Sequence, residues 1–135
     1  MEMSKTLVFP DKENKQGKHT NHLGDHEWFV DGKRHRDGAP ALINATGFRA
    51  WYQNGLKHRD NGPAVYRMDA GAAWFKHDKR HRDNGPAIIS FKFIPDPDRF
   101  FLDGIEVTDP LVIKMILAKG VRDNEPRTDE SFYRT

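Results

Sequence analysis

The sequence contains no cysteine. This absence excludes disulfide bonds, a catalytic thiol and zinc sites built from thiolates. A long apolar run is also lacking, because the best one, Leu111 to Ala118, is interrupted by Lys114 and is too short to cross a bilayer. The first residues, MEMSKTLVFPDKENK, have no apolar stretch of the kind found in a secretory signal. We therefore expect a cytoplasmic protein.

The sequence also lacks a large excess of charge of one sign. The 135 residues carry a formal net charge of +2, which argues against a basic tail or an acidic solvating segment. Hydrophobic residues make up 36% and charged residues 31% of the chain. These values predict a single domain with a modest core.

What the sequence does have is a repeated phrase. HRDNGPA occurs at 58–64 and again at 81–87, and the near-copy HRDGAPA occupies 35–41. The residues in and before this phrase recur at a constant interval of 23: Trp28, Trp51 and Trp74; His35, His58 and His81; Arg36, Arg59 and Arg82; Asp37, Asp60 and Asp83; Pro40, Pro63 and Pro86; Ala41, Ala64 and Ala87. A fixed period in this range is the signature of a repeat array.

Two further segments resemble incomplete copies. FFLDG (100–104) aligns with the tryptophan segment but begins 26 residues after Trp74, which places three extra residues in the loop IPDPD (94–98). Upstream, QGKHTNHLG (16–24) resembles an earlier, decayed copy whose register fails.

Each tryptophan is followed by a predicted tight turn. Asp31-Gly32, Asn54-Gly55 and Asp103-Gly104 suit a type I′ turn, which needs positive φ at both central residues. His77-Asp78 occupies this place in the third copy and accepts the conformation less readily. Each unit is therefore predicted to be a short aromatic strand, a tight turn and a return strand that carries His-Arg.

The repeated phrase itself predicts a corner or bulge. Positions 38, 61 and 84 hold Gly, Asn and Asn, which tolerate a left-handed conformation, and a proline follows two residues later. Apolar pairs then begin the next extended stretch: Leu42-Ile43, Val65-Tyr66 and Ile88-Ile89. Glycine and proline are thus expected to serve backbone geometry here.

We predict an all-β repeat array, an antiparallel β-hairpin meander with a C-terminal capping α-helix. Equivalent residues of neighbouring copies should lie two strands, about 9–10 Å, apart. The predicted helix spans 109–120, with Asp109 as N-cap, Pro110 in the first turn and Gly120 as the stop. Its sequence, LVIKMILAK, is apolar around most of the circumference and predicts a buried plug. The chain then divides into a polar N-terminal leader or decayed repeat (1–26), the array (27–108), the helix (109–120) and a polar tail (121–135), in which Phe132 and Tyr133 could dock.

The unit W-[FY]-x-[ND]-G-x-x-H-R-D-x-G-P-A resembles the MORN repeat. It is more similar still to variant repeats with HR-x-x-GPA in bacterial MORN-like antitoxin families and in proteins of large phages and giant viruses. The resemblance covers residues 27–108 and implies a hairpin array. MORN-type arrays serve as scaffolds, dimerisation modules and proposed lipid binders, so the resemblance favours no single function, and the antitoxin-like relatives add the expectation of an inhibitor that neutralises a partner.

We expect no catalytic site and no cofactor. An active site is needed once, whereas the His-Arg-Asp phrase is repeated, and neighbours such as His35 and Arg36 point to opposite faces of a strand. Histidines about 9–10 Å apart cannot share a zinc ion, whose Zn–N bonds are about 2 Å long. The N-terminal cluster of His19, His22, Asp25 and His26 is closer in sequence, but Asn21 and Gly24 interrupt any helix that would align it. We expect no metal at either place.

The expected binding residues are the cations and aromatics of the array. Intra-repeat pairing of the arginines with Asp37, Asp60 and Asp83 is the structural alternative, and core packing is the alternative for the aromatics. The candidates are Arg36, Arg59, Arg82, Lys33, Arg34, Lys57, Lys79, Arg80, Tyr52 and Phe75, whereas the repeated Trp, His and Pro residues are expected to be structural.

The expected function is non-enzymatic binding of a partner protein. Because a single-layer sheet cannot hide both faces, the C-terminal helix, a second copy of the chain or a partner should cover the second face. Binding to anionic membrane lipid is the alternative. Nucleic-acid binding ranks lower, because aspartates interrupt the positive stripe.

Overall fold

The structure, a computed structural model, describes residues 15–91 and 97–125. Tandem short strands fill the described part of the chain and one helix ends it. The elements are β1 (Gly17–Thr20), β2 (His26–Val30), β3 (Lys33–Arg34), β4 (Leu42–Ile43), β5 (Phe48–Ala50), β6 (Tyr52–Gln53), β7 (Leu56–Lys57), β8 (Val65–Arg67), β9 (Gly71–Ala73), β10 (Phe75–Lys76), β11 (Lys79–Arg80), β12 (Ile88–Ser90), β13 (Phe100–Leu102), β14 (Ile105–Val107) and α3 (Pro110–Arg122).

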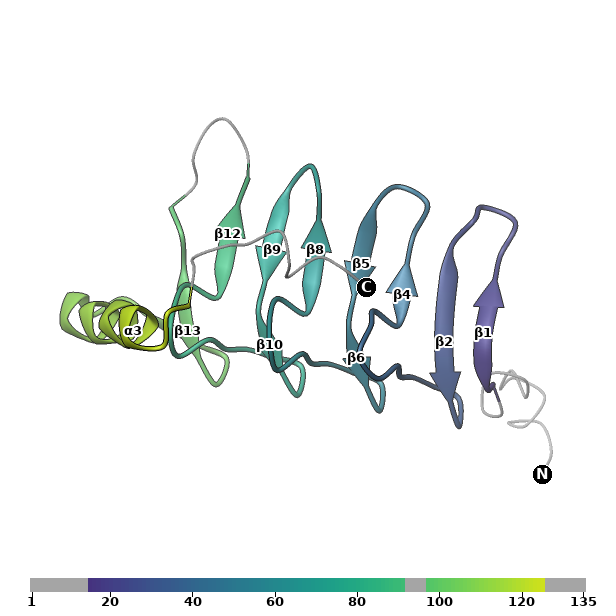
Figure 1. Ribbon diagram of the computed structural model, residues 1–135, viewed down its shortest axis with the longest axis horizontal. Coiled ribbons are helices and arrows are strands. Elements are labelled where there is room, and N and C mark those ends of the chain that lie inside the picture. The colour runs from purple at the N-terminus through teal and green to yellow at the C-terminus, as the bar shows by residue number, and fades with distance from the viewer. Residues whose placement is uncertain (1–14, 92–96, 126–135) are drawn as a thin grey trace, which may run out of the picture.

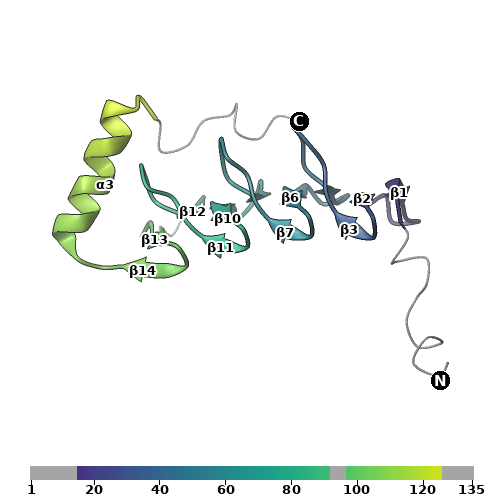
Figure 2. The same ribbon diagram turned by 90° about the horizontal axis from the view of Figure 1, so that it is seen from below.

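The main sheet is an antiparallel meander in the order β1-β2-β4-β5-β8-β9-β12, with β3 paired to β2 (Figure 1). Three small two-stranded sheets, β6–β7, β10–β11 and β13–β14, accompany it along the array (Figure 2). Each aromatic strand therefore makes a tight hairpin with the short return strand after its turn, and the apolar stretch after the corner joins the main sheet. The return strand was expected to carry His-Arg, which was wrong, because in the first three copies His-Arg comes directly after that strand. The predicted all-β hairpin array with a capping helix is confirmed.

All four tight hairpins use the predicted turn. Both central residues have positive φ in Asp31-Gly32, Asn54-Gly55, His77-Asp78 and Asp103-Gly104. The third hairpin is therefore regular, although its turn contains no glycine. The His77 ring lies 4.3 Å from the His58 ring, and the His77 N–H donates to Nδ1 of His58 at 3.0 Å, so the neighbouring copy supports this turn.

The corner differs from the prediction in one detail. Gly38 has a φ of +76°, whereas Asn61 and Asn84 are not left-handed. The left-handed expectation for the two asparagines was therefore wrong. Pro40 and Pro63 are fully buried at this corner, and the alanine after each of them is also fully buried.

The segment before β2 has the structure of a repeat. Its hairpin loop contains Asn21 and Gly24, which lie 23 residues before Asn44 and Gly47 in the next loop. In both loops the glycine N–H donates to the asparagine carbonyl, at 3.1 and 3.0 Å. The 23-residue interval, which failed when 16–24 was aligned with the tryptophan segment, therefore holds for this loop. Strand β1 is the last strand of a preceding, incomplete copy.

Helix α3 lies at the C-terminal end of the array (Figure 2). Asp109 caps it by accepting from the N–H of Leu111 at 2.9 Å, as predicted. The predicted stop at Gly120 was wrong, because the helix continues to Arg122 and ends at Asp123 and the left-handed Asn124. A Cβ on Gly120 would lie 2.4 Å from the carbonyl oxygen of Asn84. Glycine is thus needed there for close packing of α3 on the third corner.

The helix is also less buried than its composition predicts. Only Ile116 and Gly120 are buried, whereas Leu111, Met115 and Val121 are 71%, 69% and 81% exposed. The expectation of a buried plug was wrong: α3 caps the array through a narrow stripe. Its outer side remains apolar and accessible.

Candidate functional site

The arginines of the repeated phrase lie flat on the tryptophans of their own copies. The guanidinium carbons of Arg36, Arg59 and Arg82 are 3.7, 4.0 and 4.0 Å from the ring centroids of Trp28, Trp51 and Trp74. At the buried Arg82–Trp74 pair such a contact contributes about 2 kcal/mol, and at the partly buried pairs less. The repeated tryptophan and arginine are therefore one packing unit.

The same guanidiniums bind the corner. Nη1 of each arginine donates to the carbonyl of the proline four residues later, at 3.1–3.2 Å. At Gly62 and Gly85 a Cβ would lie 2.9 and 2.6 Å from the guanidinium carbon of Arg59 and Arg82. The glycine of the phrase thus makes room for its arginine. Arg82 is only 3% exposed, so it has no accessible surface to offer a partner.

The repeat histidines connect one copy to the next. Nδ1 of His35, His58 and His81 accepts the backbone N–H of the first turn residue of the following hairpin, at 3.1, 3.0 and 2.9 Å. Nε2 of His35 and His58 lies 3.2 and 3.0 Å from the carboxylates of Asp37 and Asp60. These contacts give each repeat histidine a structural role between neighbouring copies.

Asp60 has a second partner. Its carboxylate accepts from Nζ of Lys76 at 2.9 Å, and this hydrogen bond is the main reason why the pKa of Asp60 is lowered. Lys76 belongs to the next copy, so the pair adds a charged contact between copies.

A second row of cations covers the other aromatics. Arg34 lies over Tyr52 at 5.5 Å, Lys57 over Phe75 at 4.9 Å, and Arg80 over Phe101 at 5.5 Å. In each case the cation comes from one copy and the ring from the next. Lys33 and Lys79 are exposed, and a Cβ added at Gly55 or Gly104 would lie 3.6 Å from the Cβ of the respective lysine.

The candidate binding residues therefore divide into two groups. Arg36, Arg59 and Arg82 lie against the corner, where they help to hold each copy together. Arg34, Lys57 and Arg80, with Tyr52 and Phe75, form the separate second row. The sequence alone did not separate these two rows.

The main sheet has one buried and one open face. Tyr66, Ala72 and Ile89 pair in register on three neighbouring strands and are 9%, 5% and 1% exposed. The alternate row, Val65, Ala73 and Ile88, is only partly buried. Because successive side chains alternate between faces, these two rows mark opposite sides of the sheet.

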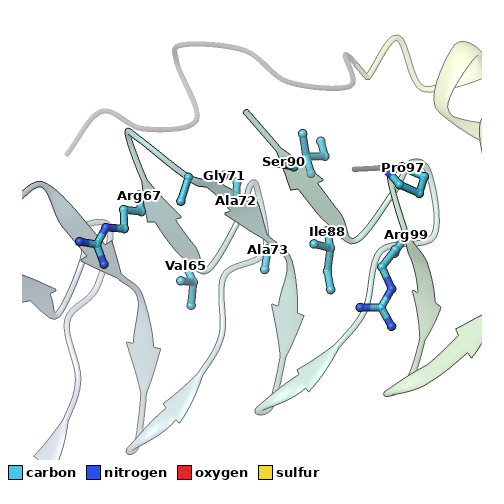
Figure 3. A pocket seen from close by; sticks show the side chains of 11 residues that line it. Val65, Arg67, Gly71, Ala72, Ala73, Ile88, Ser90, Pro97 and Arg99 are labelled. Carbon is cyan, nitrogen blue, oxygen red and sulfur yellow. The ribbon is translucent and has the colours of Figure 1, made fainter. Parts of the chain in front are cut away.

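The open face contains a shallow hollow of about 560 Å³. Figure 3 shows Val65, Ala73 and Ile88 side by side along it, with Arg67 at one margin and Arg99 at the other. Strand β9 (Gly71–Ala73) contributes only small side chains, which explains why the surface sinks there. The sequence did not indicate this hollow, because the small apolar residues of its floor come from separate strands and form no motif.

Both marginal arginines have carboxylate partners. Nε of Arg67 lies 3.0 Å from Asp69. Arg99 donates through Nε and Nη2 to both carboxylate oxygens of Glu106, at 2.9 Å each, which lowers the pKa of Glu106 and raises that of Arg99. The hollow is therefore an apolar floor between two paired, exposed charges.

Two histidines of the N-terminal cluster make polar contacts within their own hairpin. His19 Nε2 lies 3.1 Å from the Gln16 carbonyl, and His26 Nδ1 lies 2.8 Å from the Thr20 hydroxyl. Asp25 accepts the N–H of Ala45, the main reason why its pKa is lowered. Within 15–91 and 97–125, no three His, Cys, Asp or Glu side chains are grouped to hold a metal ion.

Comparisons with known proteins add no family. No family model, no curated protein and no solved structure matches the chain. In the part of the chain that the structure describes, no helix has the length and apolar character needed to cross a membrane.

Proposed function

We propose that this protein is a non-catalytic protein-binding module whose contact surface is the open face of the main sheet. The hollow over Val65, Ala73 and Ile88 is the observation that carries this proposal. An apolar concavity on an otherwise polar array is the usual setting of a binding site.

The role of the repeated phrase supports a non-catalytic reading. Each histidine, arginine and glycine of HRDNGPA has a packing or hydrogen-bonding task that recurs in the next copy. The array is thereby a stiff scaffold that presents its open face. In keeping with the resemblance to antitoxin-like arrays, we expect the partner to be inhibited when bound.

A pull-down from the cognate host lysate tests the proposal. Val65→Asp places a charge on the floor of the hollow, whereas Ile105→Asp places the same charge on a 73% exposed residue of β14. We expect one stoichiometric protein to be captured by the wild type and by Ile105→Asp, and lost with Val65→Asp. Circular dichroism establishes that both variants are folded. A capture that is indifferent to Val65→Asp would refute the open face as the contact surface.

A second candidate function rests on helix α3. Its exposed residues include Leu111, Met115 and Val121, and all its charged residues are cations: Lys114, Lys119 and Arg122. An apolar and basic helix of this kind suits an anionic lipid surface. Sedimentation with phosphatidylserine vesicles, abolished by Met115→Asp and absent with phosphatidylcholine, is the result that would support it. No sedimentation with either lipid would exclude it.

A further inference from the structure

The outer side of α3 exposes more apolar surface than a cap requires. A terminal cap of a repeat array ordinarily presents a polar outer face, which keeps the array soluble. Helix α3 packs on the array through Ile116 and Gly120, yet it leaves Leu111, Met115 and Val121 exposed to solvent. Exposed apolar side chains gathered on one element mark a binding surface. The outer side of α3 is therefore a candidate contact site, separate from the main sheet.

One flank of this helix is hollowed into a groove of about 340 Å³. Its apolar lining comes from both α3 and β13, which lie side by side at the end of the array (Figure 1). The lining residues are Leu102 of β13 and Val112, Met115, Ile116 and Ala118 of α3. A volume of roughly 300–1,000 Å³ is typical of a binding pocket. Methionine is flexible and polarisable, so Met115 can adapt its shape to an apolar side chain placed beside it.

The margin of the groove presents an arginine that the described residues leave without an ion pair. Asp83, Lys119 and Arg122 line this margin. Nζ of Lys119 lies 2.8 Å from the carboxylate of Asp123 and 3.9 Å from that of Asp83, so Lys119 is engaged with both carboxylates. Arg122 makes no ion pair with any carboxylate in the part of the chain that the structure describes. Its guanidinium is therefore open to an outside carboxylate, a group that arginine binds in bidentate geometry.

The shape and charge of the groove discriminate among possible occupants. A bilayer surface is broad and flat, so it would cover the exposed helix residues without entering the groove. A second copy of the chain would bring together two helices whose charged residues, Lys114, Lys119 and Arg122, are all cations. An acidic segment of another protein meets neither objection, because an apolar side chain fits the floor and a carboxylate fits Arg122.

We propose that the groove between α3 and β13 binds a short acidic segment of a partner protein. An apolar side chain of this segment lies against Val112 and Met115, and a neighbouring carboxylate accepts hydrogen bonds from the Arg122 guanidinium. This site goes beyond the proposed function, because it lies at the end of the array rather than on the open face of the main sheet. The array thus offers two separate contact surfaces.

The chemistry of the segment is tested without assuming its sequence. A phage-displayed library of random peptides is selected in parallel on the wild type, on Met115→Asp and on Val121→Asp. Met115→Asp places a carboxylate in the groove, whereas Val121→Asp places the same charge on an exposed residue of α3 that does not line it. We expect the wild type and Val121→Asp to select the same peptides, in which Asp or Glu accompanies a large apolar residue. Met115→Asp should not select them, although circular dichroism shows it to be folded.

Two charge reversals locate the carboxylate contact. Isothermal titration calorimetry measures the affinity of the most strongly selected peptide for Arg122→Glu and for Lys114→Glu. Both residues are exposed on α3, but only Arg122 lines the groove. We expect Arg122→Glu to lower the affinity about tenfold and Lys114→Glu to change it by less than about twofold.

Several results would overturn the inference. The first is a selection that yields no acidic peptide, or an equal loss of binding in each variant and its control. Binding to phosphatidylserine vesicles that Arg122→Glu and Lys114→Glu weaken to the same degree would assign α3 to lipid. Self-association that Met115→Asp abolishes would assign the groove to a second copy. In the peptide-free ¹⁵N-labelled protein, a shift of the Phe132 or Tyr133 amide signal in Met115→Asp would assign the groove to the chain's own tail.

The inference and the proposed function can fail separately. Val65→Asp, on the open face, should leave the peptide affinity unchanged, and a loss there would move the peptide site to that face. Capture from lysate that depends on Val65 supports the open face whether or not the groove binds a peptide.

Discussion

Replacing Gly120 with alanine should destabilise the protein, although alanine is the better helix former. Helix propensity alone predicts a gain of about 1 kcal/mol for this substitution in a helix interior. In the structure the new Cβ would lie 2.4 Å from the backbone carbonyl oxygen of Asn84. Ordinary C···O contacts begin at about 3.3 Å, so α3 and the third corner would have to separate by roughly 0.9 Å.

This separation has a calculable cost. Forcing an extra methyl group into a close-packed contact costs typically about 1–3 kcal/mol. The displacement would also strain the hydrogen bond of 3.1 Å between Asn84 and Asp123, and the burial of Ile116 against the array. Set against the gain in propensity, we expect a net loss of about 1–2 kcal/mol in the free energy of unfolding.

Urea denaturation followed by tryptophan fluorescence measures this change. Ala118→Gly is the matched control, because it reverses the substitution on the exposed side of the same helix and should cost about 1 kcal/mol through propensity alone. A short array that unfolds cooperatively allows both midpoints to be compared. A higher midpoint for Gly120→Ala than for the wild type would refute the close-packing argument.

Three further predictions concern the repeats. Gly85→Ala should lower the free energy of unfolding by about 2–3 kcal/mol, because the new Cβ displaces the buried Arg82 from its tryptophan ring and its proline carbonyl. Gly62→Ala should cost less. Paired urea titrations in which Gly62→Ala costs more than Gly85→Ala would contradict this prediction. Asp78→Gly should raise stability by about 0.5–1 kcal/mol, since glycine accepts its φ of +70° without strain; an unchanged or lower melting temperature would count against this. Because the pKa of Asp60 is lowered in the folded protein, its carboxylate contributes stability that is present above about pH 4 and is lost as the pH falls through the folded-state pKa. The urea midpoint should therefore drop at acidic pH, and it should drop less in Asp60→Asn.

None of the binding residues expected from the sequence lines the hollow on the open face. Lys57, Arg80, Tyr52 and Phe75 were all expected to contribute to binding. For Phe75 this expectation was wrong, because the residue is only 8% exposed and belongs to the core cluster. Ala73, on the floor of the hollow, was missed, since small residues attract no attention when motifs are sought. The signal that finds Ala73 is the constant interval, applied to the position that holds Glu27 in the first copy and Arg99 in the last.

The period, the tight turns and the corners are determined by the sequence itself. Positive φ at Asn54-Gly55 and the fixed φ of Pro63 are local properties, so residues adjacent in the chain suffice to specify them. The two cation rows, the need for glycine at position 120 and the hollow on the sheet were decided only by the tertiary structure. These features depend on strand register, which places Ala50, Val65 and Ala73 side by side, and on the approach of α3 to a corner that lies 36 residues earlier in the chain, at Asn84.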